Sequence, residues 1–266
     1  MSLLRCCSSL GCPDRSLDET LALAERHHLA AVELRTLGGS MDLPAYFASK
    51  FQTPERLARH LRGSPVRIVA LNTSLRLIGG TPAEREELVA VVEWAEALGI
   101  RWLRVFDGGR DANAAELAEA AATLGWWSSL RRERQWRVEV MVETHDSLLT
   151  TPALDRFRTA CPGVALLWDS HHTWRKGGED PLATWRSLRP AVVHVHVKDS
   201  VGRPSARHPF TYVLPGDGEF PSRPLIAALQ ADRFEGPVSL EWEKQWHPYL
   251  PPLEDALRAA ERCGWW

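Results

Sequence analysis

Two histidines and a lysine occupy alternate positions in the segment AVVHVHVKDS, residues 191–200. Side chains of a strand point alternately to its two faces, so His194, His196 and Lys198 share one face and the valines share the other. Imidazole and ammonium groups can bind a metal ion, hold a substrate oxygen or transfer a proton. We expect the valine face to pack against helices and the ionisable face to enter an active site.

Carboxylates stand at the ends of several other apolar segments. Glu143 lies in VETHD, Asp169 in WDSHH and Glu241 in SLEWEK. One such carboxylate by itself is more often a helix N-cap or a member of a surface ion pair. Their chemistry becomes informative only if the fold brings them together.

Short apolar or β-branched segments alternate with longer amphipathic segments along the whole chain. The eight strand candidates begin at Leu3, Ala30, Val66, Arg101, Arg137, Gly163, Ala191 and Gly236. Helix candidates cover residues 16–28, 53–61, 81–99, 113–127, 151–160, 180–188, 222–230 and 253–263. Start signals support them, such as Ser16 with Glu19 at the capping-box spacing.

This alternation predicts a parallel sheet covered by helices. Eight β/α units favour a closed (β/α)8 TIM barrel, one domain spanning residues 1–266, over an open doubly wound sheet. An open sheet usually carries a glycine-rich turn after its first strand, and no G-x-G-x-x-G follows any strand candidate here.

The carboxyl ends of barrel strands converge on one site. Glu143, Asp169, His196 and Glu241 would come from four successive strands and point inward. They could not all be buried without a compensating cation, so the set predicts one divalent metal ion. Three carboxylates and one imidazole favour Mn²⁺ or Mg²⁺, with Co²⁺ or Zn²⁺ as alternatives.

The stretches VETHD, WDSHH, HVHVKD, PGDGEF and SLEWEK, in this order, resemble the xylose isomerase-like family. That family comprises sugar phosphate isomerases and epimerases, inosose dehydratases and a DNA-repair endonuclease branch. The resemblance extends from Ala30 onward, and it implies that the four residues named above are the metal ligands. It also implies that His172, three residues after Asp169, contacts the substrate. His194 receives no such role, and a hydrogen-bonded position behind the ligands is favoured for it.

Further side chains fall near the predicted mouth of the barrel. The residues expected to contact substrate are Glu33, Arg35, His145, His172, Trp174 and Lys198. Trp174 and Trp246 could form an aromatic wall against the C–H face of a sugar. Arg35, Arg104, Arg175 and Arg203 could bind a phosphate or carboxylate, or could form surface ion pairs. Glu243, Lys244 and His247 are interpreted as rim residues.

The expected reaction is isomerisation or epimerisation of a sugar, sugar phosphate or cyclitol through an enediolate. A metal that polarises a carbonyl eases removal of a proton from the adjacent carbon. Glu143 and Glu241 are the expected acid/base pair, as the resemblance implies for epimerases. The alternative is a dehydratase like the inosose dehydratases, in which His172 or His145 protonates a leaving hydroxyl.

Two other classes are less favoured. The endonuclease branch uses extra histidines at the third and fourth strand ends, where this chain has Asn72 and Asp107. A net charge of −2 also lacks the positive excess expected for binding a phosphate backbone, so no nucleic-acid partner is expected. A barrel that binds sugar without catalysis would be indicated by a lost ligand, and none is lost.

Composition sets the remaining expectations. No apolar run is long enough to span a bilayer, and the N-terminus does not fit a secretory signal, so we expect a cytoplasmic protein without a membrane partner. Five cysteines without paired spacing indicate reduced thiols. The oligomeric state stays open, a homodimer included.

Overall fold

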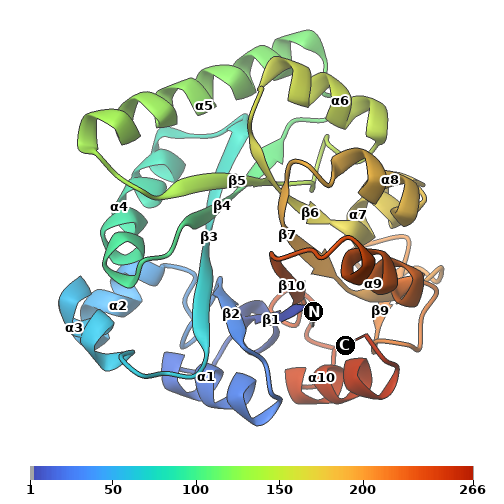
Figure 1. The fold of residues 1–266 in the computed structure, drawn as a ribbon, viewed down its shortest axis with the longest axis horizontal. Helices are drawn as coiled ribbons and strands as arrows, with labels where there is room; N and C mark the ends of the chain where they lie inside the picture. The colour runs from blue at the N-terminus through green and yellow to red at the C-terminus, as the bar shows by residue number, and fades with distance from the viewer. Residues whose placement is uncertain (1–2, 266) are drawn as a thin grey trace.

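All eight strand candidates form strands, and these close into one parallel barrel (Figure 1). The structure, a computed structural model, describes residues 3–265. The barrel strands are β1 (Leu4–Ser8), β2 (Ala31–Leu34), β3 (Arg67–Ile78), β4 (Trp102–Gly108), β5 (Glu139–Glu143), β6 (Ala165–Asp169), β7 (Val192–Val197) and β10 (Pro237–Leu240). They pair in the order β1-β10-β7-β6-β5-β4-β3-β2, which confirms the predicted (β/α)8 barrel.

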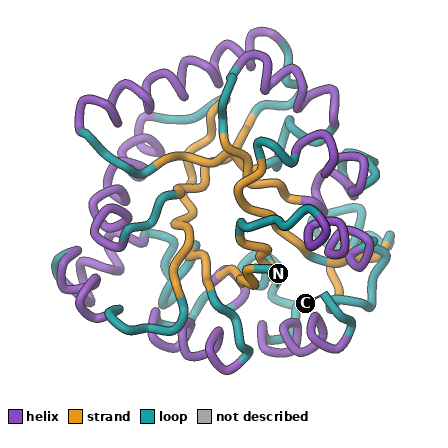
Figure 2. The backbone as a smooth tube through the Cα atoms, viewed as in Figure 1, coloured by secondary structure: helices purple, strands orange, loops and turns teal. Residues whose placement is uncertain are grey.

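The helices lie outside the barrel (Figure 2). They are α1 (Leu17–Arg26), α2 (Leu43–Phe51), α3 (Pro54–His60), α4 (Pro82–Leu98), α5 (Ala114–Arg134), α6 (Thr151–Ala160), α7 (Ser170–Arg175), α8 (Pro181–Leu188), α9 (Ser222–Ala231), α10 (Leu253–Arg262) and the 3-10 turn η1 (Ser9–Gly11). The predicted start of α1 is confirmed, because Ser16 and Glu19 form a reciprocal capping box. None of the helices within residues 3–265 combines the length and apolarity needed to cross a bilayer.

Three features were not predicted from the sequence. Helix α2 begins after Asp42, whose side chain accepts a hydrogen bond from the amide of Ala45. Helix α7 begins directly where β6 ends. The short strands β8 (Asp199–Val201) and β9 (Thr211–Val213) pair antiparallel outside the barrel. Asp199 also accepts amide hydrogen bonds from Gly216 and Gly218 of the PGDGEF segment, which fixes that loop beside the hairpin.

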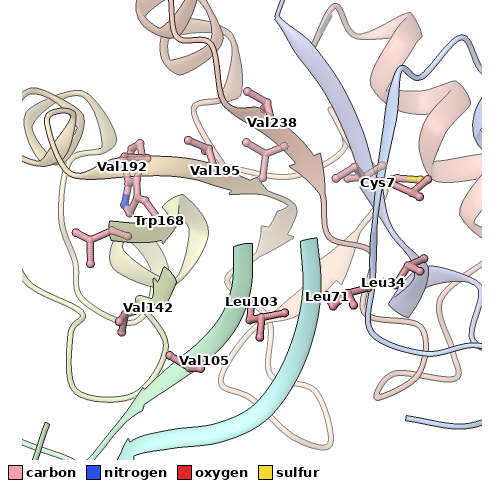
Figure 3. Packing of buried hydrophobic residues seen from close by; sticks show 14 of the residues in the cluster. Cys7, Leu34, Leu71, Leu103, Val105, Val142, Trp168, Val192, Val195 and Val238 are labelled. Carbon is pink, nitrogen blue, oxygen red and sulfur yellow. The ribbon is translucent and has the colours of Figure 1, made fainter. Parts of the chain in front are cut away.

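Two apolar layers surround the strands. The outer layer lies between the strands and the helices, and the inner layer fills the lower part of the barrel. Figure 3 shows members of the outer layer on consecutive strands, including Leu34, Leu71, Leu103 and Val142. The inner layer consists of Ala70, Met141 and Leu167. Its small size leaves the upper interior of the barrel to polar residues.

The strand β7 follows the expected alternation with one exception. Val195 and Val197 pack in the outer layer, as predicted. Val193 instead packs against the inner layer, because the register between β6 and β7 shifts at Leu166/Leu167, which pair with Val192 and His194. The extra residue turns the strand locally, as a β-bulge does.

The cysteines carry no disulfide in the described chain. Cys6, Cys7, Cys12, Cys161 and Cys263 are all free. All but Cys263 are buried, in agreement with the predicted reduced thiols.

Candidate metal centre and active site

The four predicted ligands converge at the carboxyl end of the barrel. Glu143 and Asp169 end β5 and β6, His196 lies near the end of β7, and Glu241 follows β10. All four are buried, and one ligand atom of each lies within 4.8 Å of those of the other three. The fold therefore brings together residues that are up to 98 positions apart, from 143 to 241.

The donor atoms of this group fit a divalent cation. His196 Nδ1 is buried and makes no hydrogen bond. Glu143 Oε2 and Asp169 Oδ2 are also buried, and their partners are ion-pair contacts, with Arg104 for the first and with Lys198 and His172 for the second. His196 Nδ1 lies 3.3 Å from Glu241 Oε2 and 3.6 Å from Glu143 Oε1. Leaving a buried polar atom such as His196 Nδ1 without a partner costs about 1–3 kcal/mol, which a bound ion would remove. Oxygen donors with one imidazole suit a hard or borderline dication.

Glu33 holds the opposite nitrogen of His196. Its carboxylate lies 2.9 Å from His196 Nε2 and accepts a hydrogen bond of 2.9 Å from Ser239 Oγ. Burial alone would lower the pKa of His196, but the charges of Glu241 and Glu33 raise it well above its usual value. A carboxylate in this position fixes the tautomer and orientation of a metal-binding imidazole.

The position of Glu33 does not support the prediction that it contacts substrate. It is fully buried beneath His196 and does not line the cavity above. His194 lies at the same depth, with Nε2 3.4 Å from Glu33 Oε2, and burial lowers its pKa to about 4. His194 therefore lies behind the four predicted ligands, as expected, but neither of its ring nitrogens makes the hydrogen bond that was expected.

Lys198 bridges three acids at the end of β7. Its Nζ lies 2.8 Å from Asp169 Oδ2 and 2.6 Å from Glu243 Oε1, and it also contacts Glu241. Burial would lower the pKa of Lys198, but these carboxylates raise it well above its usual value. The ammonium therefore stays charged and orders the acids around it. Tyr212 donates a further hydrogen bond of 2.8 Å to Glu243.

Two histidines flank the group. Asp169 caps helix α7 by accepting the amide of His172, which places His172 Nδ1 3.2 Å from Asp169 Oδ2. Burial lowers the pKa of His172 well below its usual value, and Lys198 adds to this effect, so the imidazole is neutral. His145 Nδ1 is hydrogen-bonded to Asp146 Oδ1 at 2.9 Å. Burial would lower the pKa of His145, but this hydrogen bond together with the charges of Glu143 and Asp146 raises it above its usual value.

Asp107 at the end of β4 positions the loop that carries His145. It accepts hydrogen bonds from the amides of His145, Asp146, Ser147 and Leu148. These donors occupy both of its oxygens. We assign Asp107 to loop structure.

A cavity of about 290 Å³ opens above the four-residue group. Its lining residues are Leu10, Arg35, Arg104, Phe106, Glu143, His145, His172, Lys176, Arg207, His208, Tyr212, Glu241, Glu243, Trp246 and His247. Trp246 is therefore on the wall, as expected. Larger hollows of about 520 and 360 Å³ lie near Arg101 and Trp102, at the amino ends of the strands and away from the histidine and carboxylate group.

Trp174 does not line the cavity, contrary to the prediction for it. Its ring packs edge-on against Phe220, with centroids 5.3 Å apart, and Arg175 lies over it. The first turns of α7 direct His172 inward, and the helical rotation then directs Trp174 outward. Arg175 forms an ion pair of 2.8 Å with Glu219, and Arg203 is exposed outside the cavity.

Arg207, His208 and Tyr212 line the cavity, but the sequence did not predict them as lining residues. They belong to the β8–β9 hairpin and its loop. Strands of three residues are too short to give a periodic signal. The aromatic residues of HPFTYV were the only sign of a packed segment there.

Comparison with known proteins gives a consistent family signal. The family model described as xylose isomerase-like TIM barrel matches residues 21–264. The inosose dehydratase of Klebsiella pneumoniae is 30% identical over 161 residues, which cover 54% of this chain and 52% of that protein. The inosose dehydratase of Clostridium perfringens is 27% identical over 170 residues, covering 58% and 56%. Each match spans about half the length of the curated relative.

Solved structures share the fold over the whole chain. The probable 3-DHS dehydratase AsbF from Bacillus anthracis gives a TM-score of 0.77 at 17% identity, covering 98% of this chain and 99% of that one. The IolI protein, whose structure holds a zinc atom, gives 0.74 at 20% identity, covering 99% and 96%. At these identities the likeness establishes the barrel and leaves the reaction to be argued from the site.

Proposed function

This chain belongs to the xylose isomerase-like TIM barrel family, and from this premise we propose that it is a metal-dependent dehydratase of a small polyhydroxylated cyclic ketone. The observation that carries the proposal is the buried group of Glu143, Asp169, His196 and Glu241 under one cavity. The sequence favoured an isomerase or epimerase and kept the dehydratase as the alternative. Relatives named inosose dehydratase support the alternative better.

The four residues would hold one divalent ion, for which the oxygen-rich donor set favours Mn²⁺ or Mg²⁺. When bound, such an ion polarises a carbonyl group and acidifies the neighbouring C–H. Burial would raise the pKa of Glu241, but His196 and Lys198 lower it well below its usual value, so it is ionised. An ionised carboxylate beside the substrate can accept that proton.

Dehydration requires a base for one proton and an acid for the leaving hydroxyl. Glu143 or Glu241 would accept the proton from the carbon next to the carbonyl, and a C=C bond would form as the C–O bond at the next carbon breaks. The hydroxyl would leave as water after taking a proton from an acid. His145 suits this role, because its raised pKa favours the protonated ring. His172, whose pKa is lowered, suits hydrogen bonding to the substrate.

The test is product analysis with the Mn²⁺-loaded protein in deuterated water. The substrates would be a neutral inosose and a carboxylated cyclic ketone such as a dehydroshikimate. We expect at least one to lose one molecule of water, detected by mass spectrometry and by absorbance of the new conjugated bond. A product of unchanged mass, apart from deuterium at the carbon next to the carbonyl, would overturn the dehydratase and favour the epimerase.

Two variants test the acid/base assignment. Glu143→Gln and Glu241→Gln keep side-chain size but remove a base and a ligand charge, so turnover should fall at least about a hundredfold. Glu235→Gln, on an exposed acid near the amino ends of the strands, is the matched control and should retain activity. Full activity in both active-site variants would exclude the two-glutamate scheme.

A further inference from the structure

Two arginine side chains line the cavity although both are almost fully buried. Arg35 is 5% exposed and Arg104 is 2% exposed. Arg35 follows β2 and Arg104 lies on β4, so they approach the cavity from two sides of β3. Burying two like charges near each other is unfavourable unless an anion compensates them. Burial, followed by the charge of Arg104, lowers the pKa of Arg35 to about 10, which shows that the two groups influence each other.

The irregular part of β3 holds both guanidinium groups by their edges. Arg104 Nη1 donates to the carbonyl of Thr73 at 2.9 Å. Arg35 Nη1 and Nη2 donate to the carbonyl of Asn72 at 3.4 Å and to Ser74 Oγ at 2.9 Å. The pairing of β3 with β4 shifts register between Asn72 and Arg76, which frees these β3 groups from the ladder. The guanidinium groups are therefore held in place before any ligand binds.

Each arginine has a carboxylate nearby, but that carboxylate is engaged elsewhere: Glu87 accepts hydrogen bonds from Ser74, and Glu143 is a proposed metal ligand. The nearest acid to Arg35 is Glu87, at 4.0 Å. Arg104 Nε lies 3.2 Å from Glu143 Oε2 but makes no hydrogen bond, and Glu143 is proposed to share its charge with the metal. An arginine has five N–H donors, and three or fewer are used here by each. Donors remain for a ligand.

Asn72 adds a neutral polar group on β3, the strand between those of the two arginines, although it is not itself among the residues that line the cavity. It pairs with Arg104 across β3 and β4, and it shares the inner strand face with Ala70. It is 2% exposed, and neither its Oδ1 nor its Nδ2 makes a hydrogen bond. A buried amide without partners is costly, and a ligand bound beside it would supply them.

We infer that Arg35, Asn72 and Arg104 form a carboxylate-binding subsite, so that the substrate is a cyclic polyhydroxyketone that carries a carboxylate group. The inference rests on the proposed function, because it uses the same cavity and sharpens the substrate class. A guanidinium presents paired N–H donors that match the two oxygens of a carboxylate. A neutral cyclitol ketone would give the remaining N–H donors of the two guanidinium groups no anionic partner.

A carboxylate fits this subsite better than a phosphate. Phosphate sites of such barrels are usually formed by the loops after the last two strands and a helix N-terminus. The subsite here lies on β2, β3 and β4 instead. The cavity of about 290 Å³ also lies at the small end of ligand pockets, which suits one ring with a small substituent.

Calorimetric titration of the Mn²⁺-loaded protein tests the inference without turnover. The probes are shikimate, a carboxylated cyclitol, its methyl ester, which lacks the charge, and inorganic phosphate. We expect shikimate to bind about tenfold or more tightly than the ester, the scale of a charge-assisted hydrogen bond. Equal binding of acid and ester would overturn the inference, as would tighter binding of phosphate than of shikimate.

Arginine variants locate the effect. Arg35→Gln and Arg104→Gln should each reduce the preference for the acid over the ester by about tenfold. Arg76→Gln is the control, because Arg76 lies on β3 but pairs with Glu84 outside the cavity. An unchanged preference for the acid over the ester in both cavity variants would overturn the assignment of these arginines. If a variant fails to fold, the comparison of shikimate with its ester on the wild-type protein still tests the inference.

The outcomes separate this inference from the proposed function. Selective shikimate binding by a protein that dehydrates neither ketone would support the subsite and refute the dehydratase. Dehydration of the neutral inosose, with no selectivity for shikimate over its ester, would support the dehydratase and refute the carboxylate subsite.

Discussion

Replacing Glu33 by glutamine tests whether the residue behind His196 controls metal binding. The carboxylate contacts His196 Nε2 at 2.9 Å and Ser239 Oγ at 2.9 Å, both fully buried. Glutamine keeps the size of the side chain but loses the charge that orients and polarises the imidazole. Loss of such a supporting carboxylate typically weakens metal affinity about 10- to 100-fold, or about 1.4–2.7 kcal/mol. We expect the metal affinity of Glu33→Gln to be lower than that of the wild type by a factor within this range.

The assay is competition for Mn²⁺ or Zn²⁺ against a chelating dye, with circular dichroism to verify folding. Asp199→Asn is a matched control, because Asp199 is also a buried acid but holds the loop at Gly216 and Gly218. Its metal affinity should stay close to that of the wild type. A folded Glu33→Gln protein with wild-type affinity would refute the role assigned to Glu33.

Four further results are expected. Asp169→Ala and His196→Ala should abolish metal binding in elemental analysis while the circular dichroism spectrum is retained; full occupancy in both would exclude the site. A metal concentration of a hundred times Kd should raise the free energy of unfolding by about 2.7 kcal/mol in a chemical denaturation experiment, and a chelator should reverse the gain. Asp107→Asn should cost at least about 2 kcal/mol in urea unfolding, since Asp107 accepts four backbone amides. Burial raises the pKa of the Cys6 thiol, so a thiol reagent should modify the half-buried Cys263 before Cys6 in the native protein, and the reverse order would contradict the packing.

The barrel and the convergence of its four strand-end residues could be predicted because both follow from short-range patterns. Alternation along each strand gives the inward face, and closure of eight parallel strands brings the strand ends to one site. Glu143, Asp169, His196 and Glu241 needed no further information to be placed together. Their joint burial is the observation on which the proposed metal site rests.

Other assignments depend on depth and rotation, which the sequence pattern does not contain. Glu33 lies on β2 and Arg35 just after its end, so alternation predicts the same direction for both, yet Arg35 lines the cavity and Glu33 lies beneath His196. Trp174 follows His172 by two residues on a helix, and this half-turn removes it from the cavity. Tyr212 reaches the site through a hairpin whose strands are too short to be recognised.

The most direct test of the account is a crystal structure of the protein soaked with Mn²⁺, with the ion located by its anomalous scattering. We expect one strong peak at coordination distance from Glu143, Asp169, His196 and Glu241, with Glu33 still hydrogen-bonded to the other nitrogen of His196. We also expect Lys198 to stay beside Glu243. No peak at this position in fully soaked crystals, or a peak bound by other residues, would contradict the central claim.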